Sequence, residues 1–395
     1  MMDAGDAALV WSAIAEPDDA EAGALVSVLG HEGALAWIGE AGHDPVAATA
    51  TLASEPRVVD RILRARERWV PRLAAARPTE LRERAECVGA RVIARGAPGW
   101  PAALEVMGAR QPHALWVRGD ADVDAAWGRS VAVVGSRAAT AYGEHVASDV
   151  AAVAAERGIA VVSGGAYGID AAAHRGALAV DGVTIAVLAG GVDRLYPAGN
   201  ALLLERVIRT GAVVSEQPPG FAPHRQRFLS RNRLIAAAGA TVVVEAALRS
   251  GALSTARHAL DMLRPVLAVP GPLTSAASAG CHRLVRESGA TLMSAPVDVL
   301  QAVMSLGDAL GEDDALEGPD FGSAAERQAY GAIPPRGASA ESIALASGLT
   351  GPEAATALAG LAARGLAARS RGLWSRAETR ETPDKTDNLV QRVSD

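Results

Sequence analysis

Residues 160–170 read Ala-Val-Val-Ser-Gly-Gly-Ala-Tyr-Gly-Ile-Asp, a β-branched run followed by a glycine-rich turn and the start of a helical pattern. Short apolar runs of this kind lie at residues 131–134, 160–162, 184–188, 212–214, 241–244 and 266–269. Segments of helical length lie between them, at residues 146–157, 170–179, 202–208 and 255–263. Strands that are apolar throughout are covered on both faces. The pattern predicts an α/β domain with a doubly wound, mostly parallel sheet over residues 90–300.

The segment before this domain has a different composition. Residues 1–85 are rich in Ala, Leu and charge, and their apolar residues keep helical spacing around Gly30. This predicts a small helical domain of the SAM or helix-hairpin-helix kind. No arginine cluster precedes Arg57. We therefore favour packing or protein contact over direct DNA binding for this domain.

The segments after the α/β domain predict a linker and a second small domain. Residues 301–325 are acidic and glycine-containing, which is typical of a solvated linker. Residues 326–377 predict a winged-helix domain, with helices at 339–347 and 350–364 and a hairpin at 366–374. Thr350 and Glu353 match a capping box, and Gly365 stands where a helix commonly ends. Residues 378–395 are polar and predicted to be disordered.

Composition excludes several classes of protein. The chain has 395 residues, 49% of them hydrophobic, which argues against global disorder. Its only lysine is Lys385, far from any glycine loop, which excludes a P-loop ATPase. Its only cysteines, Cys87 and Cys281, exclude a multi-thiolate zinc site and imply no disulfide framework. The acidic N-terminus and the lack of an apolar run of ~18 residues predict a soluble, cytoplasmic protein with no membrane partner.

Charge is distributed unevenly along the chain. The formal net charge is −7, which does not suggest a nucleic-acid partner. Residues 131–287, however, contain 15 arginines against 11 acidic residues, a net charge of +4. The α/β domain is therefore the candidate for binding a polyanion.

Three glycine-rich loops follow predicted strands. In a parallel sheet they lie at one edge, where backbone N–H groups at helix N-termini can bind phosphate. A single loop would more simply be a tight turn, but three together with Arg137 favour phosphate binding. The candidate binding residues of the first loop are Gly135, Ser136 and Arg137, and those of the second loop are Ser163, Gly164, Gly165, Tyr167 and Gly168. The third loop covers residues 190–193.

An arginine-rich segment follows at residues 225–233. It contains four arginines and one phenylalanine and no acidic residue. Arginines that neutralise phosphates beside an aromatic ring that stacks on bases are typical of single-strand binding. The alternative is that these arginines pair with acidic residues elsewhere. The candidate DNA-binding residues are Arg225, Arg227, Phe228, Arg231, Asn232 and Arg233.

The acidic and histidine residues near these loops are interpreted as structural. Asp170 and His174, at helical spacing i and i+4, predict a pair that fixes the second loop. Glu216 and Glu245 follow strands and could cap helices or hold hydroxyl groups, and Glu245 is expected to organise the turn at 250–251. No nucleophile or set of metal ligands accompanies them. The sequence therefore predicts no catalytic residue, no metal site and no cofactor.

The motifs together resemble those of the DNA-processing protein A (DprA/Smf) family. The resemblance covers about residues 98–290, in order. It rests on Gly135-Ser136-Arg137, residues 163–174, residues 190–197, Phe228 with residues 231–233, residues 244–256, residues 269–271 and the turn at Gly280. The segment departs from the family in having Leu229 where proline is common, and arginine where relatives often have lysine. Arg225 and Arg227 are expected to replace those lysines.

The resemblance implies an extended Rossmann-like domain that binds single-stranded DNA, with Arg137, Phe228, Arg231, Asn232 and Arg233 lining the groove. It further implies protection of incoming DNA in natural transformation, loading of a RecA-type recombinase, and a homodimer formed through the Rossmann-like domain. A helical N-terminal domain and a C-terminal winged helix are also common in the family.

Two other functions stay open. A nucleotide-processing enzyme, similar to a nucleoside-monophosphate phosphoribohydrolase, could use the Gly164-Gly165 loop, although the register Pro-Gly-Gly-x-Gly-Thr of such enzymes is missing. A transcription regulator could act through residues 326–376. Its second helix carries one arginine and no Asn, Gln or Lys that could recognise base edges, so we expect an accessory contact there.

Overall fold

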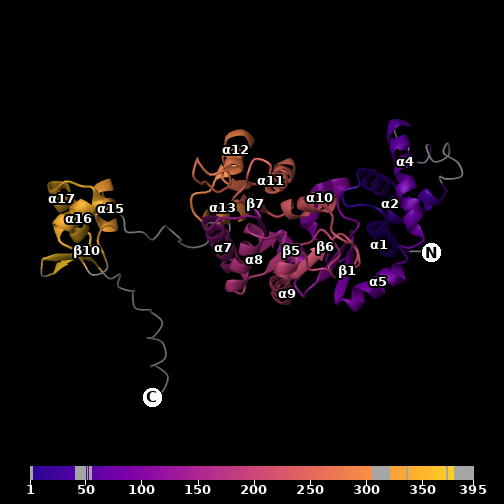
Figure 1. Cartoon of the computed structure of the whole chain (residues 1–395), viewed down its shortest axis with the longest axis horizontal. Helices are drawn as coiled ribbons and strands as arrows, with labels where there is room; N and C mark the ends of the chain where they lie inside the picture. Colours follow the sequence, from indigo (N-terminus) through magenta and orange to yellow (C-terminus); the bar gives the residue numbers. More distant parts are fainter. Residues whose placement is uncertain are drawn as a thin grey trace, which may run out of the picture. The chain divides into compact units, whose positions relative to one another are not determined.

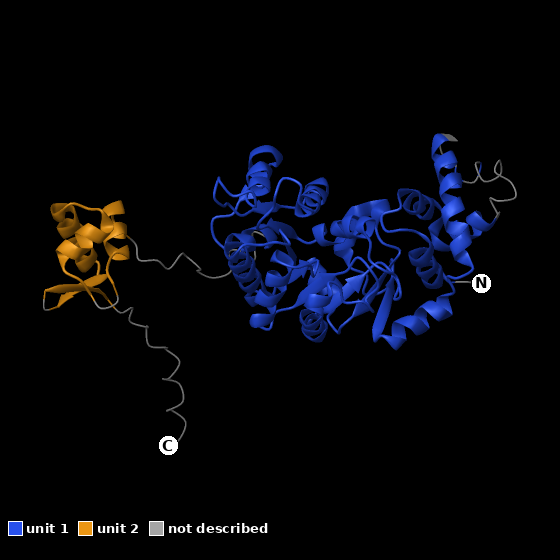
Figure 2. Ribbon diagram, in the orientation of Figure 1, with its two compact units in different colours: residues 1–311 blue, residues 312–395 orange. Residues whose placement is uncertain are grey.

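The computed structural model describes residues 3–40, 50, 52, 56–304, 321–334, 337–370 and 372–377. The chain divides into two compact units, Met1–Gly311 and Glu312–Asp395 (Figure 2). Most of the acidic linker expected at 301–325, namely residues 305–320, lies outside the described residues, as does the whole segment 378–395 expected to be disordered. Within the described residues no helix combines the length and the apolar character needed to cross a membrane.

The first unit is built on one nine-stranded sheet within the described residues, in the order β1-β2-β6-β5-β4-β3-β7-β8-β9 (Figure 1). The strands are β1 Ala90–Ala94, β2 Ala114–Arg118, β3 Ser130–Val134, β4 Ala160–Ser163, β5 Thr184–Val187, β6 Ala212–Ser215, β7 Ala240–Val243, β8 Val266–Ala268 and β9 Thr291–Leu292. Neighbours from β6 to β9 are parallel, whereas β2 joins β1 and β6 antiparallel. All six predicted runs form strands, and the predicted fold class is confirmed. The pattern of apolar runs does not reveal β1, β2 or β9.

Helices cover both faces of the sheet because successive strand residues point to opposite sides. On one face, Val131 and Val133 share a buried cluster with residues of α7 (Ala141–Glu156), α8 (Ile169–Ala179) and α13 (Asp298–Val303). On the other face, Ala132 and Val134 share one with α6 (Val123–Gly128), α10 (Arg225–Ala236), α11 (Ala252–Asp261) and α12 (Ala279–Ser288). Helix α9 (Ala201–Thr210) packs against β5 and β6. The sheet is therefore doubly wound.

Strand β3 is the topological switch point of the sheet. It pairs with β4 on one side and with β7 on the other. After β3 the chain continues into β4 on one side of β3. Strand β7, on the other side of β3, is the first strand of the other half of the sheet. The loops after β3 and β7 consequently diverge at the carboxyl ends of these strands, where open α/β sheets bind ligands.

The N-terminal helices pack onto the β1–β6 end of the sheet (Figure 1). They are α1 (Ala4–Ile14), α2 (Ala20–Glu40), α4 (Pro56–Leu73) and α5 (Pro78–Cys87). Helix α2 is interrupted at Gly30, whose φ of 70° lies in the left-handed region. The rings of Trp11 and Trp69 meet edge to face with centroids 5.1 Å apart, in a buried cluster that extends to Val213 of β6. These helices and the sheet therefore share one core.

The second unit contains α15 (Ala324–Gly331), α16 (Ala340–Ser347) and α17 (Gly351–Ala363), followed by the antiparallel strands β10 (Ala367–Ser370) and β11 (Leu373–Arg376). The capping box at Thr350 and Glu353 forms as predicted, and Gly365 has a φ of 71° just after α17. Helices followed by a short hairpin are the arrangement of a winged helix.

Candidate nucleic-acid interface

A pocket of about 420 Å³ lies at the switch point. Its walls are the loop after β3, the loop before α8, helix α10, and the loop between β7 and α11. Six residues that the sequence predicts as DNA-binding line it: Gly135, Ser136, Arg137, Phe228, Arg231 and Asn232. The structure therefore brings the first glycine loop and part of the arginine-rich segment to one place.

The ring of Phe228 contacts two guanidinium groups. Cζ of Arg137 lies 5.2 Å from the ring centroid and Cζ of Arg231 lies 5.9 Å from it. The ring of Tyr196 is next to Phe228, with centroids 5.7 Å apart, and is 49% exposed. Arg137 is itself exposed. An exposed cation beside aromatic rings is the combination that phosphate neutralisation and base stacking at one site require.

Arg231 is a buried part of this cluster. It is 4% exposed and donates from Nη1 to the carbonyl oxygens of Gly164, at 2.8 Å, and Val187. Burial lowers the pKa of Arg231 to about 10, against the opposing effect of Asp170. The guanidinium therefore stays protonated at neutral pH. It adds positive potential to the pocket floor from a fixed position.

The second glycine loop is held by its own contacts. The Asp170 carboxylate accepts hydrogen bonds from the N–H groups of Gly164 (3.2 Å) and Ala166 (3.3 Å), and burial raises its pKa. A Cβ on Gly164 would lie 2.4 Å from Nη2 of Arg231, and one on Gly168 would lie 2.3 Å from the Ser136 oxygen. These glycines allow close approach of the loop to its neighbours. The prediction that the Gly164 N–H binds phosphate is corrected, because that group is already engaged.

The remaining residues of this loop lie around the pocket rather than in its lining. Ser163 is buried and donates from Oγ to the Val133 oxygen at 2.7 Å, which is a structural contact. Gly165 is buried, and its carbonyl accepts from Asn200. Tyr167 is 48% exposed, so its ring is accessible for stacking. Of the two predicted glycine loops, the loop after β3 therefore presents its predicted residues Gly135, Ser136 and Arg137 to the pocket.

The predicted Asp170–His174 pair does not form. His174 is fully buried, and its Nδ1 lies 2.7 Å from Thr184 Oγ1. The Thr184 hydroxyl donates to the Val161 oxygen, so it accepts from Nδ1–H of His174. Burial lowers the pKa of His174 to about 3. Helical spacing places the two side chains near each other but does not make them partners.

Glu245 takes one of the two roles left open for it, at the start of a helix, and does not organise the turn at 250–251. Its carboxylate accepts from the Thr140 N–H at 2.9 Å and from Thr140 Oγ1 at 2.7 Å. It therefore fixes the N-terminus of α7 rather than the turn at 250–251. Asn232 contacts that turn instead, donating from Nδ2 to the Gly251 oxygen at 3.4 Å.

The arginines of α10 point to two sides of the helix. Phe228, Arg231, Asn232 and Ile235 line the pocket at positions i, i+3, i+4 and i+7. Arg227 and Arg233 do not line the pocket and are buried. Arg225 is exposed at the start of the helix.

The prediction that Arg227 and Arg233 line a DNA groove is therefore wrong. Arg227 pairs with Glu16 at 3.0 Å, and Arg233 pairs with Glu216 at 2.6 Å. Glu216 is thus the partner of an arginine rather than a helix cap. For these two residues the alternative interpretation, arginine bridging to acids, is the correct one.

Two further groups at the site are absent from the predicted binding residues, although Tyr196 lies within the motif at residues 190–197. Tyr196 reaches Phe228 from the loop after β5, and Arg249 is an exposed lining residue on the loop after β7. The position of Arg249, just beyond the carboxyl end of a strand, is the signal that could have found it. The contact of Tyr196 with Phe228 depends on the conformation of its loop, which the sequence does not show.

The described residues contain no group of three or more His, Cys, Asp or Glu side chains placed to hold a metal ion. Asp170 carries the one carboxylate among the residues that line the pocket. It already accepts hydrogen bonds from the backbone N–H groups of Gly164 and Ala166. What the pocket offers chemically is cationic and aromatic binding.

Comparison with known proteins identifies the family. Residues 91–304 match the family model described as DNA recombination-mediator protein A, which is more than half of the chain. The chain belongs to this family. The resemblance to DprA/Smf proteins drawn from the motifs is thereby confirmed.

Individual relatives agree with the assignment. A putative DNA processing protein DprA from Mycobacterium tuberculosis is 50% identical over 299 residues, covering 72% of this chain and 77% of the relative. Protein Smf of Escherichia coli is 43% identical over 48% of this chain and 50% of its own length. The X-ray structure of DprA from Streptococcus pneumoniae has a TM-score of 0.55 at 30% identity, covering 69% of this chain and 93% of that one. The similarity thus extends beyond the sheet.

Proposed function

We propose that this DNA recombination-mediator family member binds single-stranded DNA in the pocket at the switch point. The observation that carries the proposal is the contact of the exposed Arg137 and the buried Arg231 with the ring of Phe228. Arg137 would neutralise a phosphate while Phe228, with Tyr196 beside it, stacks on a base. Exposed Arg249, which also lines the pocket, would meet the next phosphate.

The chemistry of the pocket favours a single strand over a duplex. A base can stack on Phe228 or Tyr196 only if its face is free, as it is in an unpaired strand. Every base has such a face, so binding should depend little on sequence. Ionic contacts with phosphates should make it depend strongly on salt.

A mediator of recombination passes its DNA to another protein. We propose that the bound strand is protected and then handed to a RecA-type recombinase, as the family resemblance implies. The test is recombinase ATP hydrolysis on a strand already covered by a single-strand-binding protein. Addition of this protein should shorten the lag, and a variant without strand binding should not.

We also propose a homodimer formed through the Rossmann-like domain, on the same family basis. Two pockets in one assembly would raise the local concentration of strand-binding sites. Light scattering of the full chain and of the chain ending at residue 304 tests it. Both should give twice the monomer mass. If the shorter chain were a monomer, the dimer contact would depend on residues after 304.

The alternative, a nucleotide-processing enzyme, needs a carboxylate free to act on a bound nucleotide. Asp170 and Glu245 are both engaged with N–H or hydroxyl donors of the chain itself. The geometry therefore favours binding without chemistry. Release of free base from nucleoside monophosphates by the pure protein would support the enzyme instead.

The deciding experiment is fluorescence anisotropy with a labelled strand and with its duplex, each titrated at several salt concentrations. Tighter binding of the strand, with an affinity that falls linearly in a double-logarithmic plot against salt, is expected. A polypyrimidine strand should bind about as well as a mixed one. Equal affinity for strand and duplex would overturn the proposal.

A further inference from the structure

The side of α10 that faces away from the pocket is held by an acidic turn between α1 and α2. Arg227 donates from Nε to Glu16 Oε2 at 3.0 Å and from Nη2 to Glu16 Oε1 at 3.2 Å. Its third nitrogen, Nη1, donates to the Ala222 oxygen at 2.9 Å. All three nitrogens are engaged, so this guanidinium has little capacity left for a phosphate.

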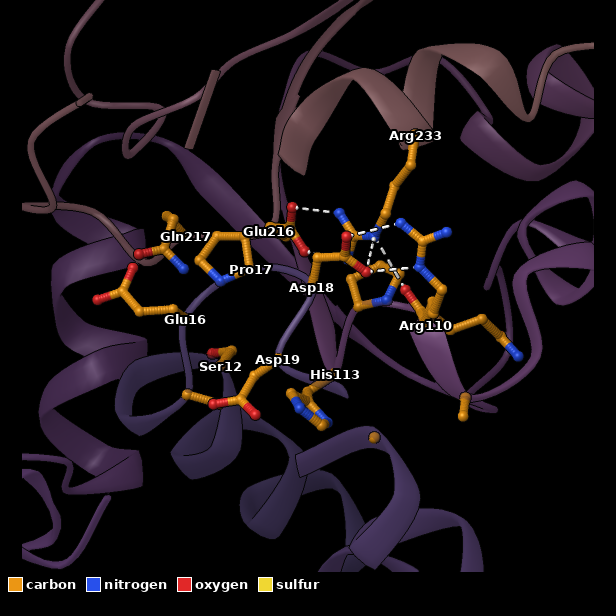
Figure 3. Close-up of a pocket in the computed structure, with 15 residues that line it drawn as sticks. Ser12, Glu16, Pro17, Asp18, Asp19, Arg110, His113, Glu216, Gln217 and Arg233 are labelled. Carbon is orange, nitrogen blue, oxygen red and sulfur yellow. Dashed lines mark hydrogen bonds and ion pairs between the residues drawn. The ribbon is translucent and has the colours of Figure 1, made fainter. Parts of the chain in front are cut away.

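Arg233, six residues further along the helix, is held mainly by Glu216 and lies beside the acidic turn. Its Nη1 and Nη2 donate to the two Glu216 oxygens at 2.7 and 2.6 Å, and its Nε donates to the Arg110 oxygen at 3.0 Å. Asp18 lies 3.5 Å from Nε and also accepts two hydrogen bonds from Arg110, at 2.8 and 2.7 Å. Figure 3 shows this alternation of acidic and basic side chains around Asp18.

These contacts fix the rotation of α10 about its axis. Arg227 and Arg233 are 8% and 1% exposed, and each has a two-pronged carboxylate partner. A rotation that turned Phe228 away from the pocket would pull both buried cations from these partners. Removing a buried charge from its partner is unfavourable, so the bonds on one side of the helix orient the residues on the other.

We propose that the acidic turn at residues 16–19 is a positioning element of the strand-binding site. It acts through Arg227 and Arg233 and does not touch DNA. The inference rests on the proposed strand binding at Phe228 and Arg231. It gives the N-terminal helices a role in DNA binding that needs no DNA contact of their own.

The alternative is that the turn competes with DNA for the same arginines. Glu16 has a side chain 39% exposed, and Arg72 and His224 also lie within 3.0 and 3.7 Å of it. If a strand displaced Glu16 from Arg227, the turn would weaken binding. The two roles predict opposite results when the carboxylate is removed.

The test compares Glu16→Gln with Asp6→Asn in the full-length protein. Asp6 pairs with Arg82 at 2.7 Å, so the control removes the same charge from an ion pair on the N-terminal helices whose arginine is exposed and not buried. Glu16→Gln should weaken strand binding about tenfold with an unchanged salt dependence. It should also speed amide hydrogen exchange in α10, and the control should change neither. Tighter binding with a steeper salt dependence, or no change in either measurement, overturns the proposal.

A rescue variant separates orientation from charge. In Arg227→Met combined with Glu16→Leu, an apolar pair of similar volume replaces the ion pair. Strand affinity and slow exchange of α10 should both return toward the wild-type values, and failure to return would contradict positioning. If the wild-type protein bound no strand, the proposed function would fail. The exchange rates of Glu16→Gln would then still show whether the turn holds α10.

Discussion

The guanidinium of Arg137 lies 5.2 Å from the ring centroid of Phe228, although one residue belongs to the loop after β3 and the other to α10. The parallel sheet places the loop at its carboxyl edge, and the packing of α10 across the neighbouring strands brings the ring to meet it. The contact joins an exposed guanidinium to an aromatic face. The exposed cation comes from the loop and the ring from the helix, so the pairing exists only in the folded chain.

Replacing Arg137 with alanine removes one phosphate contact. We expect weaker binding of a single strand and a log–log salt slope smaller in magnitude by about 0.7, the value for one phosphate on single-stranded DNA. Anisotropy titrations at several salt concentrations measure both. Arg129→Ala is the matched control, because Arg129 is exposed just before the amino end of the same strand. An unchanged slope in Arg137→Ala would remove this residue from the interface.

Replacing Phe228 with alanine removes a stacking surface and no charge. Stacking of a base on an aromatic residue contributes about 1–3 kcal/mol. We therefore expect an affinity loss of about 5- to 150-fold, with the salt slope unchanged, in the same titrations. Phe228→Trp should keep the affinity. If the alanine variant changed the slope as much as Arg137→Ala does, the ring would be acting only by placing the arginine.

Much of the fold follows from periodicity. Strands such as β3 and β4 are buried on both faces and are therefore apolar throughout, which makes them visible in the sequence. Strand β1 has a mixed burial pattern at the edge of the sheet, and β9 has two exposed residues. Weakly buried strands leave little apolar signal, which accounts for β1 and β9. Strand β2 is almost entirely buried, so weak burial does not explain why the pattern of apolar runs does not reveal it.

The site was predictable only in part, because a run of arginines does not show which way each points. Interpreting residues 225–233 as a helix would have placed Arg233 away from Phe228 and Arg231. Arg227, however, is four residues from Arg231 and on the same face, so helical spacing does not set it apart. The partners Glu16 and Glu216 are distant in sequence. Long-range ion pairs of this kind have no local signature.

Replacing Arg233 with methionine should destabilise the protein rather than act directly on binding. It leaves the Glu216 carboxylate, 6% exposed, without its cation. Breaking a buried pair in this way costs about 3–5 kcal/mol of unfolding free energy. Urea unfolding measures the loss. Adding Glu216→Leu to the same chain should recover most of it, and a double variant as unstable as the single one would contradict the assignment of this pair.

Replacing Gly164 with alanine should disturb Arg231. The new Cβ would lie 2.4 Å from Nη2, so the buried guanidinium must move. We expect a loss of about 1–3 kcal/mol in unfolding free energy, together with weaker strand binding. Gly128→Ala is the control, because a Cβ at Gly128 meets nothing within 4 Å. Urea unfolding and anisotropy test both effects, and wild-type values for Gly164→Ala would show that the loop adapts without cost.

His174 should make stability depend on pH. Its Nε2 is buried without a partner among the described residues, and burial lowers the pKa from 6.5 to about 3. Because folding lowers the pKa, the unfolded chain takes up a proton on this histidine at a higher pH than the folded chain does. The stability that His174 contributes to the free energy of unfolding is therefore present above pH 6.5 and is lost as the pH falls toward 3. Between pH 6.5 and 5 this amounts to about 2 kcal/mol. Asn at this position keeps a donor for Thr184 but does not titrate, so urea unfolding of His174→Asn should show a pH dependence smaller by that amount. The exposed His145, changed to Asn, is the control. Equal pH dependence of His174→Asn and wild type would mean that the imidazole gains its proton without penalty.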